Sequence, residues 1–170
     1  MARSFDLSAD FEDNVEEVHR AFTEEEYWRA RLAHIPVDEW SLDSLRIEDD
    51  GTVEVTTLQV VHSQHLHALF KQFHRGDICI RRSETWGPVT DGTSTASITG
   101  SVDGAPVHVT GTAVLTGKPE SAGSQLECRL AVKVRIPLIG GKLEKIIGTQ
   151  LATLVAQEQE FTTTWITNNA

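Results

Sequence analysis

Four of the seven histidines in the chain lie close together, and imidazole nitrogens are common zinc ligands. The four are His62, His65, His67 and His74. The apolar residues among them recur at intervals of three, four and seven, which is a helical period; they are Leu66, Leu69, Phe70 and Phe73. On a helix, residues two apart point about 200° away from each other, so His65 and His67 cannot share a metal ion. His67 and His74 fall on one side, but no Asp, Glu or Cys lies between them.

We therefore predict no metal site here, and we interpret the segment as a short amphipathic helical turn between two strands. Its apolar face, which includes Leu66, Phe70 and Phe73, is expected to cover the mouth of a cavity at one end of the sheet. The histidines would then mark the polar side of the turn. Two interpretations of them stay open, a pH-sensitive rim and ordinary solvated surface.

A carboxylate stands inside the apolar stripe of the last predicted helix. Glu158 follows Leu154 by four residues and precedes Phe161 by three, so all three share one helix face. A carboxylate in such a place must be paired, hydrogen-bonded or neutralised by a raised pKa. It is either a polar anchor or acid–base group in an apolar pocket, or a residue near a helix end that meets solvent or an arginine. Gln150, on the same stripe, is a second candidate anchor.

The stretch RRSETW ends a predicted strand and places charge beside apolar residues. Arg82 and Glu84 share a face with Trp86, and we favour cross-strand pairing on the outer face over an inward position. Cys128 alternates with leucines and valines, so we predict a buried, inert thiol. The chain contains no G-x-S-x-G, no HExxH and no phosphate-cradling glycine loop. No catalytic residue is predicted.

Composition and charge exclude several classes of protein. The chain has 170 residues, and we expect one domain over residues 1–170. The net charge of −10 disfavours binding to nucleic acid or to an anionic membrane surface. No window approaches the roughly 18 consecutive apolar residues of a membrane-spanning helix. Because there are two cysteines, no CxxC and no apolar leader, we expect a cytoplasmic protein.

An ordered set of strands and helices must position these residues. We predict a short strand at residues 3–8 and then two helices, the second opened by a capping box of Thr23 and Glu26 and closed by Pro36. Strands are expected at 40–48, 52–62, 77–89, 93–102, 106–115 and 125–136, with a bulge at Thr56–Thr57. A long helix covers about 142–165. Helices set apart from an antiparallel meander define an α+β fold.

The long helix carries an apolar stripe that needs a covering surface. At 100° per residue, one side holds Leu143, Ile147, Gln150, Leu151, Leu154, Phe161 and Trp165. The curved sheet is expected to supply the cover. The strand at 93–102 is rich in Ser, Thr, Ala and Gly, whose side chains fill little volume. We therefore predict a cavity under the helix; the alternative is that these small residues face solvent and the core is full.

Three stretches, together with the order of elements, carry a resemblance to a known superfamily. They are FDLSADFEDNVEEVHRAFTEEEYWRARLA, RRSETW and residues 137–165, which include PLIGGKLEKIIGTQL. The chain resembles the START-like, helix-grip superfamily, and most closely an uncharacterised actinobacterial branch of it. This resemblance implies about six to seven curved antiparallel strands wrapped on the C-terminal helix, two short helices after the first strand, and a hydrophobic pocket. The superfamily includes carriers, cyclases and hydratases, so the fold does not settle the function.

The function favoured by these observations is non-enzymatic binding of a lipid or other small hydrophobic molecule, with no cofactor. The alternatives are a cyclase- or hydratase-like enzyme that uses a pocket carboxylate, and a protein-interaction module with a collapsed pocket. Oligomeric state is not predicted. The expected pocket residues are Leu143, Ile147, Gln150, Leu151, Leu154, Glu158 and Phe161 on the helix, Cys128, Val132 and Val134 on the last strand, and Leu66, Phe70 and Phe73 in the histidine-rich segment.

Overall fold

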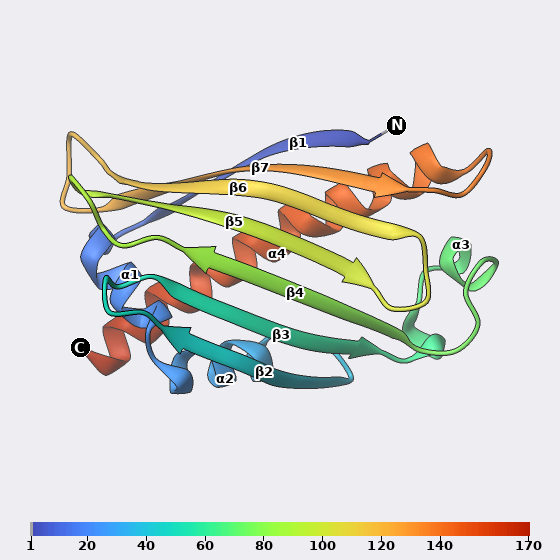
Figure 1. The fold of residues 1–170 in the computed structure, drawn as a ribbon, viewed down its shortest axis with the longest axis horizontal. Helices are drawn as coiled ribbons and strands as arrows, with labels where there is room; N and C mark the ends of the chain where they lie inside the picture. Colours follow the sequence, from blue (N-terminus) through green and yellow to red (C-terminus); the bar gives the residue numbers. More distant parts are fainter. Residues whose placement is uncertain (1) are drawn as a thin grey trace.

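The protein is built from one seven-stranded antiparallel sheet and a long C-terminal helix that runs across one face of it (Figure 1). The computed structural model describes residues 2–170. The strands are β1 (Arg3–Phe11), β2 (Glu39–Ile47), β3 (Val53–Val61), β4 (Ile78–Trp86), β5 (Thr93–Val102), β6 (Val107–Gly117) and β7 (Ser124–Val134). The helices are α1 (Val15–Phe22), α2 (Glu25–His34), the 3-10 turn η1 (Ser63–His65), α3 (Ala68–Lys71) and α4 (Gly140–Asn169). This arrangement confirms the predicted α+β helix-grip fold.

The strand order β1-β7-β6-β5-β4-β3-β2 makes β1 and β2 the two edges of the sheet. Helix α4 packs against β1 and β7, whereas α1 and α2 pack against its C-terminal half. Close contact with β1 is made possible by Gly148, since a Cβ atom at this position would overlap the ring of Phe5. Within residues 2–170 no helix has the length and apolar character needed to cross a membrane.

The start of α4 is tied to the end of β7. The carboxylate of Glu144 accepts a hydrogen bond from the backbone N–H of Val134 at 2.9 Å. The backbone N–H of Gly140 donates to the carbonyl of Ile136, also at 2.9 Å. These two contacts turn the chain after Pro137 and set the direction in which α4 returns across the sheet.

Two apolar clusters lie at opposite ends of α4. Near its C-terminal end, aromatic residues of α1 and α2 pack with β4; they include Phe22, Tyr27, Trp28 and Trp86. Near its N-terminal end, Leu143 packs with strand residues Val107, Val132 and Val134. The aromatic rings are close, with the centroids of Phe22 and Trp86 4.9 Å apart. These clusters hold the two ends of the helix to the sheet, and the space between them is only partly filled.

The predicted capping box at Thr23 and Glu26 is wrong. The box forms one helix earlier, where Asn14 accepts a hydrogen bond from the N–H of Glu17 at 2.8 Å and the Glu17 carboxylate accepts from the N–H of Asn14. Thr23 instead closes α1, and its hydroxyl donates to the carbonyl of Arg20 at 2.6 Å. Thr23 is the C-cap of α1, and the next residue, Glu24, is the N-cap of α2. The side chain of Glu24 makes no capping hydrogen bond.

The bulge predicted at Thr56–Thr57 lies on the neighbouring strand. The register shifts between Leu42 and Ser44 on β2, opposite Thr57 and Thr56. Strand β3 therefore alternates without interruption, and its inward face carries Thr57 and Gln59 after two valines. As a consequence, the amide side chain of Gln59 points into the interior. A bulge on β3 would instead have turned Leu58 inward.

Candidate ligand-binding cavity

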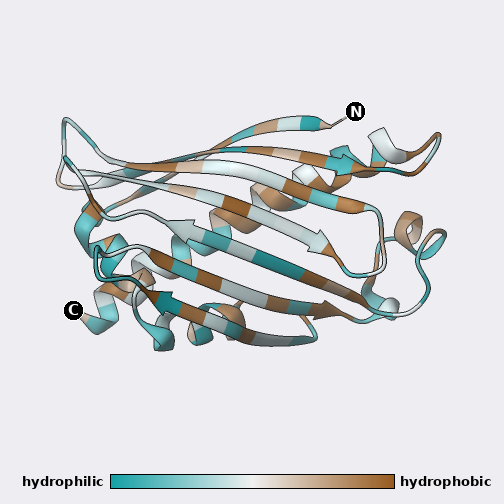
Figure 2. Ribbon diagram, viewed as in Figure 1, coloured by the Kyte–Doolittle hydropathy of each residue, from teal (hydrophilic) through white to brown (hydrophobic). Residues whose placement is uncertain are grey.

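A cavity of about 640 Å³ lies between α4 and the sheet. Strands β3 to β7, the α4 helix and the segment between β3 and β4 all contribute to its wall. Much of the wall is apolar: α4 supplies Ile146, Ile147, Leu151, Leu154 and Val155, and the strands supply Val61, Ile78, Ile80, Ile98, Val109 and Leu130. Figure 2 shows hydrophobic stretches along the strands and α4, with a hydrophilic segment in the middle of β4.

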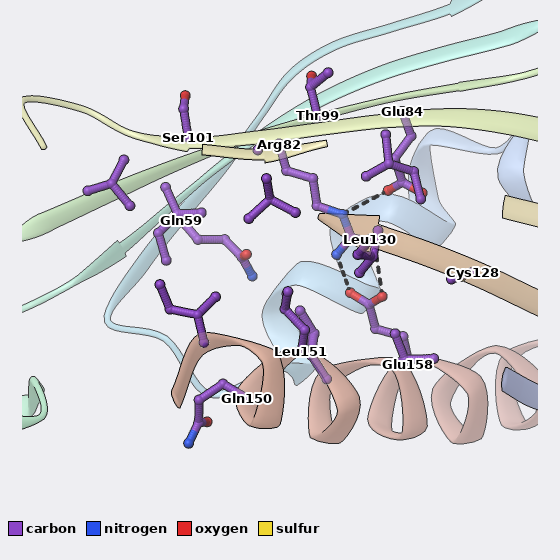
Figure 3. A pocket seen from close by; sticks show the side chains of 18 of the residues that line it. Gln59, Arg82, Glu84, Thr99, Ser101, Cys128, Leu130, Gln150, Leu151 and Glu158 are labelled. Atoms are coloured by element: carbon purple, nitrogen blue, oxygen red, sulfur yellow. Dashed lines mark hydrogen bonds and ion pairs between the residues drawn. The ribbon is translucent and has the colours of Figure 1, made fainter. Parts of the chain in front are cut away.

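The predicted cavity is therefore present, and the small residues of β5 border it. Thr99, Gly100 and Ser101 all lie on its wall. The side chains of Thr99 and Ser101 point away from α4 (Figure 3), so Gly100 between them is the residue of this run on the cavity side of β5, and it adds no side-chain volume there. The interaction module with a collapsed pocket required a filled interior, which this structure does not have.

One side of the cavity is occupied by a cluster of four charged side chains, drawn in part in Figure 3. Arg82 of β4 donates two hydrogen bonds to the carboxylate of Glu158 on α4, at 2.7 and 3.0 Å. The Nη2 atom of Arg31, on α2, lies 2.7 Å from the same carboxylate. Glu84, two residues along β4, approaches Nε of Arg82 at 3.1 Å. We call these four residues the charged cluster.

The favoured outer-face position for Arg82 and Glu84 is thus wrong. Both side chains point toward α4, and Glu84 is 5% exposed. Burial is tolerated because each charge meets an opposite charge: Arg82 and Arg31 flank Glu158, and Trp86 Nε1 donates to Glu84 at 3.2 Å. The two interpretations of Glu158 each hold in part: the carboxylate lies in the wall of an apolar cavity, and it is paired there with arginines.

The cluster keeps Glu158 ionised. Burial alone would raise the pKa of this carboxyl, but the positive charges of Arg31 and Arg82 lower it from 4.5 to about 2. The same contacts raise the pKa of both arginines against the opposing effect of burial. Arg31 is fixed further by Trp28, whose ring centroid lies 4.7 Å from the guanidinium carbon, and by a 3.2 Å hydrogen bond donated to the Tyr27 hydroxyl.

A buried amide completes the polar lining. Gln59 is 8% exposed and projects from β3 into the cavity (Figure 3). Its side-chain amide has no hydrogen-bond partner among the described residues 2–170, and its nitrogen and oxygen are not fully buried but face the open space of the cavity. Gln150, the anchor proposed on α4, borders the cavity but is exposed, and its amide is turned away from the cluster. The strand alternation that aims Gln59 inward was obscured by the bulge expected at Thr56–Thr57.

Eight of the predicted pocket residues border the cavity: Ile147, Gln150, Leu151, Leu154, Glu158, Cys128, Leu66 and Phe70. Leu143, Val132 and Val134 do not, because they pack against one another where α4 meets β7. Phe161 does not either; it packs on Tyr27 and Trp165, with ring centroids 5.9 and 6.4 Å away. Phe73 is 48% exposed. Burial of Cys128 raises the pKa of its thiol to about 11, which agrees with an inert side chain.

The segment between β3 and β4, residues 62–77, covers one end of the cavity and is called the cap. It holds η1 and the single turn α3, a shorter helical part than the apolar period predicted, and contributes His65, Leu66, His67 and Phe70 to the wall. The histidines have separate structural roles. His65 Nδ1 lies 2.9 Å from Asp38, His67 Nδ1 accepts from the N–H of Leu69, and His74 Nε2 donates to the carbonyl of Asp77.

Three side chains from three strand ends meet at the base of the cap. Ligand atoms of Glu39, His62 and Asp77 lie within 4.8 Å of one another, close enough to share a metal ion. The atoms are already engaged, however: His62 Nε2 is 2.9 Å from Glu39, and Asp77 accepts from the N–H of Ser63. The sequence argument looked for acidic partners only between His67 and His74, so this grouping was missed. Its contacts explain the geometry without a metal.

A curved sheet packed on a long C-terminal helix, with a cavity between them, is the helix-grip fold. Among solved structures, a START superfamily protein from Mycobacterium smegmatis aligns with a TM-score of 0.53 and 10% identity, covering 98% of this chain and 99% of that one. The protein TTHA0849 from Thermus thermophilus aligns with a TM-score of 0.63 and 14% identity, covering 99% of both chains. At these identities the likeness establishes the fold alone.

Sequence comparison then gives the family. The chain belongs to the family described as "Protein of unknown function (DUF2505)", whose model matches residues 6–166. It is 60% identical over 173 residues to "Uncharacterized protein Rv0481c" of Mycobacterium tuberculosis (strain ATCC 25618 / H37Rv), with 99% of both chains covered. The predicted helix-grip fold and the uncharacterised actinobacterial relatives are both confirmed.

Proposed function

We propose that the protein binds a small hydrophobic molecule, such as a lipid, in the cavity between α4 and the sheet. The observation that carries the proposal is the cavity itself, about 640 Å³ of space with a mostly apolar wall. A pocket of this size and character is typical of small-molecule sites. Burial of the ligand would contribute about 25 cal/mol for each Å² of apolar surface.

The arrangement of the wall supports binding over catalysis. A general acid or base works best with a pKa near the operating pH, whereas that of Glu158 is held at about 2. Cys128, with its pKa raised to about 11, is a poor nucleophile. A hydratase- or cyclase-like role for either group has less support than a role in shaping the site. The proposal includes the expected cytoplasmic setting, which the free thiols Cys79 and Cys128 support.

The test is a titration with Nile red, an uncharged dye whose fluorescence rises in apolar surroundings. Leu154→Trp places a larger side chain in the cavity wall and should weaken dye binding at least about tenfold. Leu138→Trp is the matched control, because Leu138 is fully exposed and outside the cavity. Unchanged binding by Leu154→Trp, or no dye binding by the parent protein, would refute the proposal. Native mass spectrometry of the purified protein then identifies any molecule that it carries.

A further inference from the structure

We infer that the ligand is uncharged and carries an oxygen acceptor, such as an ester, ketone, amide or hydroxyl group, which Gln59 and Arg82 hold. This inference rests on the proposed function and adds the chemical class of the ligand. Gln59 and Arg82 project from adjacent strands into the same part of the cavity (Figure 3).

The charged cluster has no net charge to offer a ligand. Two guanidinium groups, Arg31 and Arg82, face two carboxylates, Glu84 and Glu158, so their formal charges sum to zero. A carboxylate or phosphate ligand would leave one uncompensated negative charge in a buried site, and burial of an unpaired charge is costly. The net charge of the whole chain, −10, also opposes an anion.

A cationic ligand finds no free carboxylate. Both oxygens of Glu158 accept from Arg82, and Arg31 approaches one of them as well. In Glu84, Oε1 accepts from Trp86, and Oε2 lies near both arginines, 3.1 Å from Arg82 Nε and 3.8 Å from Arg31 Nη2. A ligand amine would therefore have to displace an arginine, which would leave that arginine buried without its partner.

The cluster does retain hydrogen-bond donors. A guanidinium group has five N–H donors, and Arg82 directs three nitrogens at carboxylates with one N–H each, which leaves two N–H groups. Arg82 is also the most accessible member of the cluster, since its side chain is 21% exposed and the other three are between 5% and 12%. It can donate to a ligand oxygen without releasing Glu158.

Gln59 is the second group aimed at the ligand. The Gln59 residue is 8% exposed, and its amide nitrogen and oxygen have no hydrogen-bond partner among residues 2–170 and keep their accessible surface toward the cavity, where a ligand can pair them. Its NH2 group would donate to a ligand oxygen, and its carbonyl would accept from a ligand hydroxyl. An alkane leaves these groups unpaired, so an oxygenated ligand gains affinity over an alkane of equal length.

The test compares five ligands with the same chain: dodecane, dodecanol, methyl dodecanoate, dodecanoic acid and dodecylamine. Each is used at pH 7 to displace Nile red from the tag-free protein. Dodecanol and the methyl ester should displace the dye at concentrations at least about tenfold lower than the ionised acid, the amine or dodecane. Equal or stronger binding of dodecanoic acid or of the amine overturns the inference, as does equal binding of dodecane and the ester.

A variant outside the charged cluster gives the second readout. Gln59→Leu should lose the preference for the ester over dodecane, measured as the ratio of the two displacing concentrations within the variant. Gln157→Leu is the matched control, because Gln157 is exposed on α4 and outside the cavity. A preference unchanged in Gln59→Leu overturns the role of this residue. Failure of every ligand and of the dye would reject the proposed function, whereas dye binding without discrimination rejects this inference alone.

Discussion

Replacing Glu158 with glutamine tests whether the charged cluster is a structural part of the cavity. The substitution keeps the size of the side chain but removes the negative charge between Arg31 and Arg82, whose nearest atoms both lie at 2.7 Å. Two guanidinium groups would then remain with the Glu84 carboxylate alone. Loss of one partner from a buried ion pair costs about 3–5 kcal/mol.

The pKa gives a second estimate of the same effect. Lowering the pKa of Glu158 from 4.5 to about 2 corresponds, at 1.36 kcal/mol per pKa unit, to about 3 kcal/mol of folding stability. Because the folded-state pKa is depressed, this contribution is fully present above pH 4.5 and is lost as the pH falls toward 2. More than half of it should be gone by pH 3.

The assay is urea unfolding of both proteins at pH 7, 5, 4 and 3. We expect Glu158→Gln to be about 3 kcal/mol less stable at pH 7 and the gap to narrow steadily in acid. The control is Glu160→Gln, at an exposed position two residues further along α4, which should change stability by less than about 0.5 kcal/mol. A loss below about 1 kcal/mol at pH 7, or a gap that is the same at pH 3, would refute the reasoning.

Two further predictions concern the helix start and the cap. Asn14→Ala should lower the free energy of unfolding by about 1 kcal/mol, because it removes the side-chain oxygen that accepts from the N–H of Glu17, and Thr23→Ala should cost less; denaturant titration compares them. The hydrogen bond to Glu39 raises the pKa of His62, so this contact of the cap is strongest below about pH 6.5 and weakens as the pH rises through the raised value. Hydrogen-exchange protection factors of residues 63–77 should therefore fall as the pH rises above about 6.5 in the parent protein and stay nearly constant in His62→Ala.

The fold was predictable from local patterns because each one reports on a single element. Alternation in Gln125–Ile136 and the apolar stripe of the last helix identified β7 and α4, and the small residues of 93–102 indicated the cavity. The helix-grip resemblance then supplied the arrangement. These signals require no knowledge of which distant side chains meet.

The polar part of the site was not predictable in the same way. Alternation placed Arg82 and Glu84 on the same face as Trp86, but the inward position was disfavoured because no partner for two buried charges was apparent in the sequence. Its partner Glu158 is 76 residues away, and Arg31 is on a third element. For Gln59, one residue of uncertainty about the bulge reversed the face, since a shift of one residue turns every side chain of a strand over.

The charged cluster explains why a cavity persists beneath an apolar helix. Between its two packed ends, α4 faces the sheet across β3 to β6 without filling the space. Arg82 spans this gap from β4 to Glu158, and Arg31 reaches the same carboxylate from α2. The distance between α4 and β4 is therefore set by the length of the Arg82 side chain and its ion pair with Glu158. Such a buried pair adds little stability over apolar residues of equal volume. We propose that its contribution is instead a fixed separation: with leucines at the same positions we expect α4 to settle onto Ile98 and Gly100 of β5, with loss of the space available to a ligand.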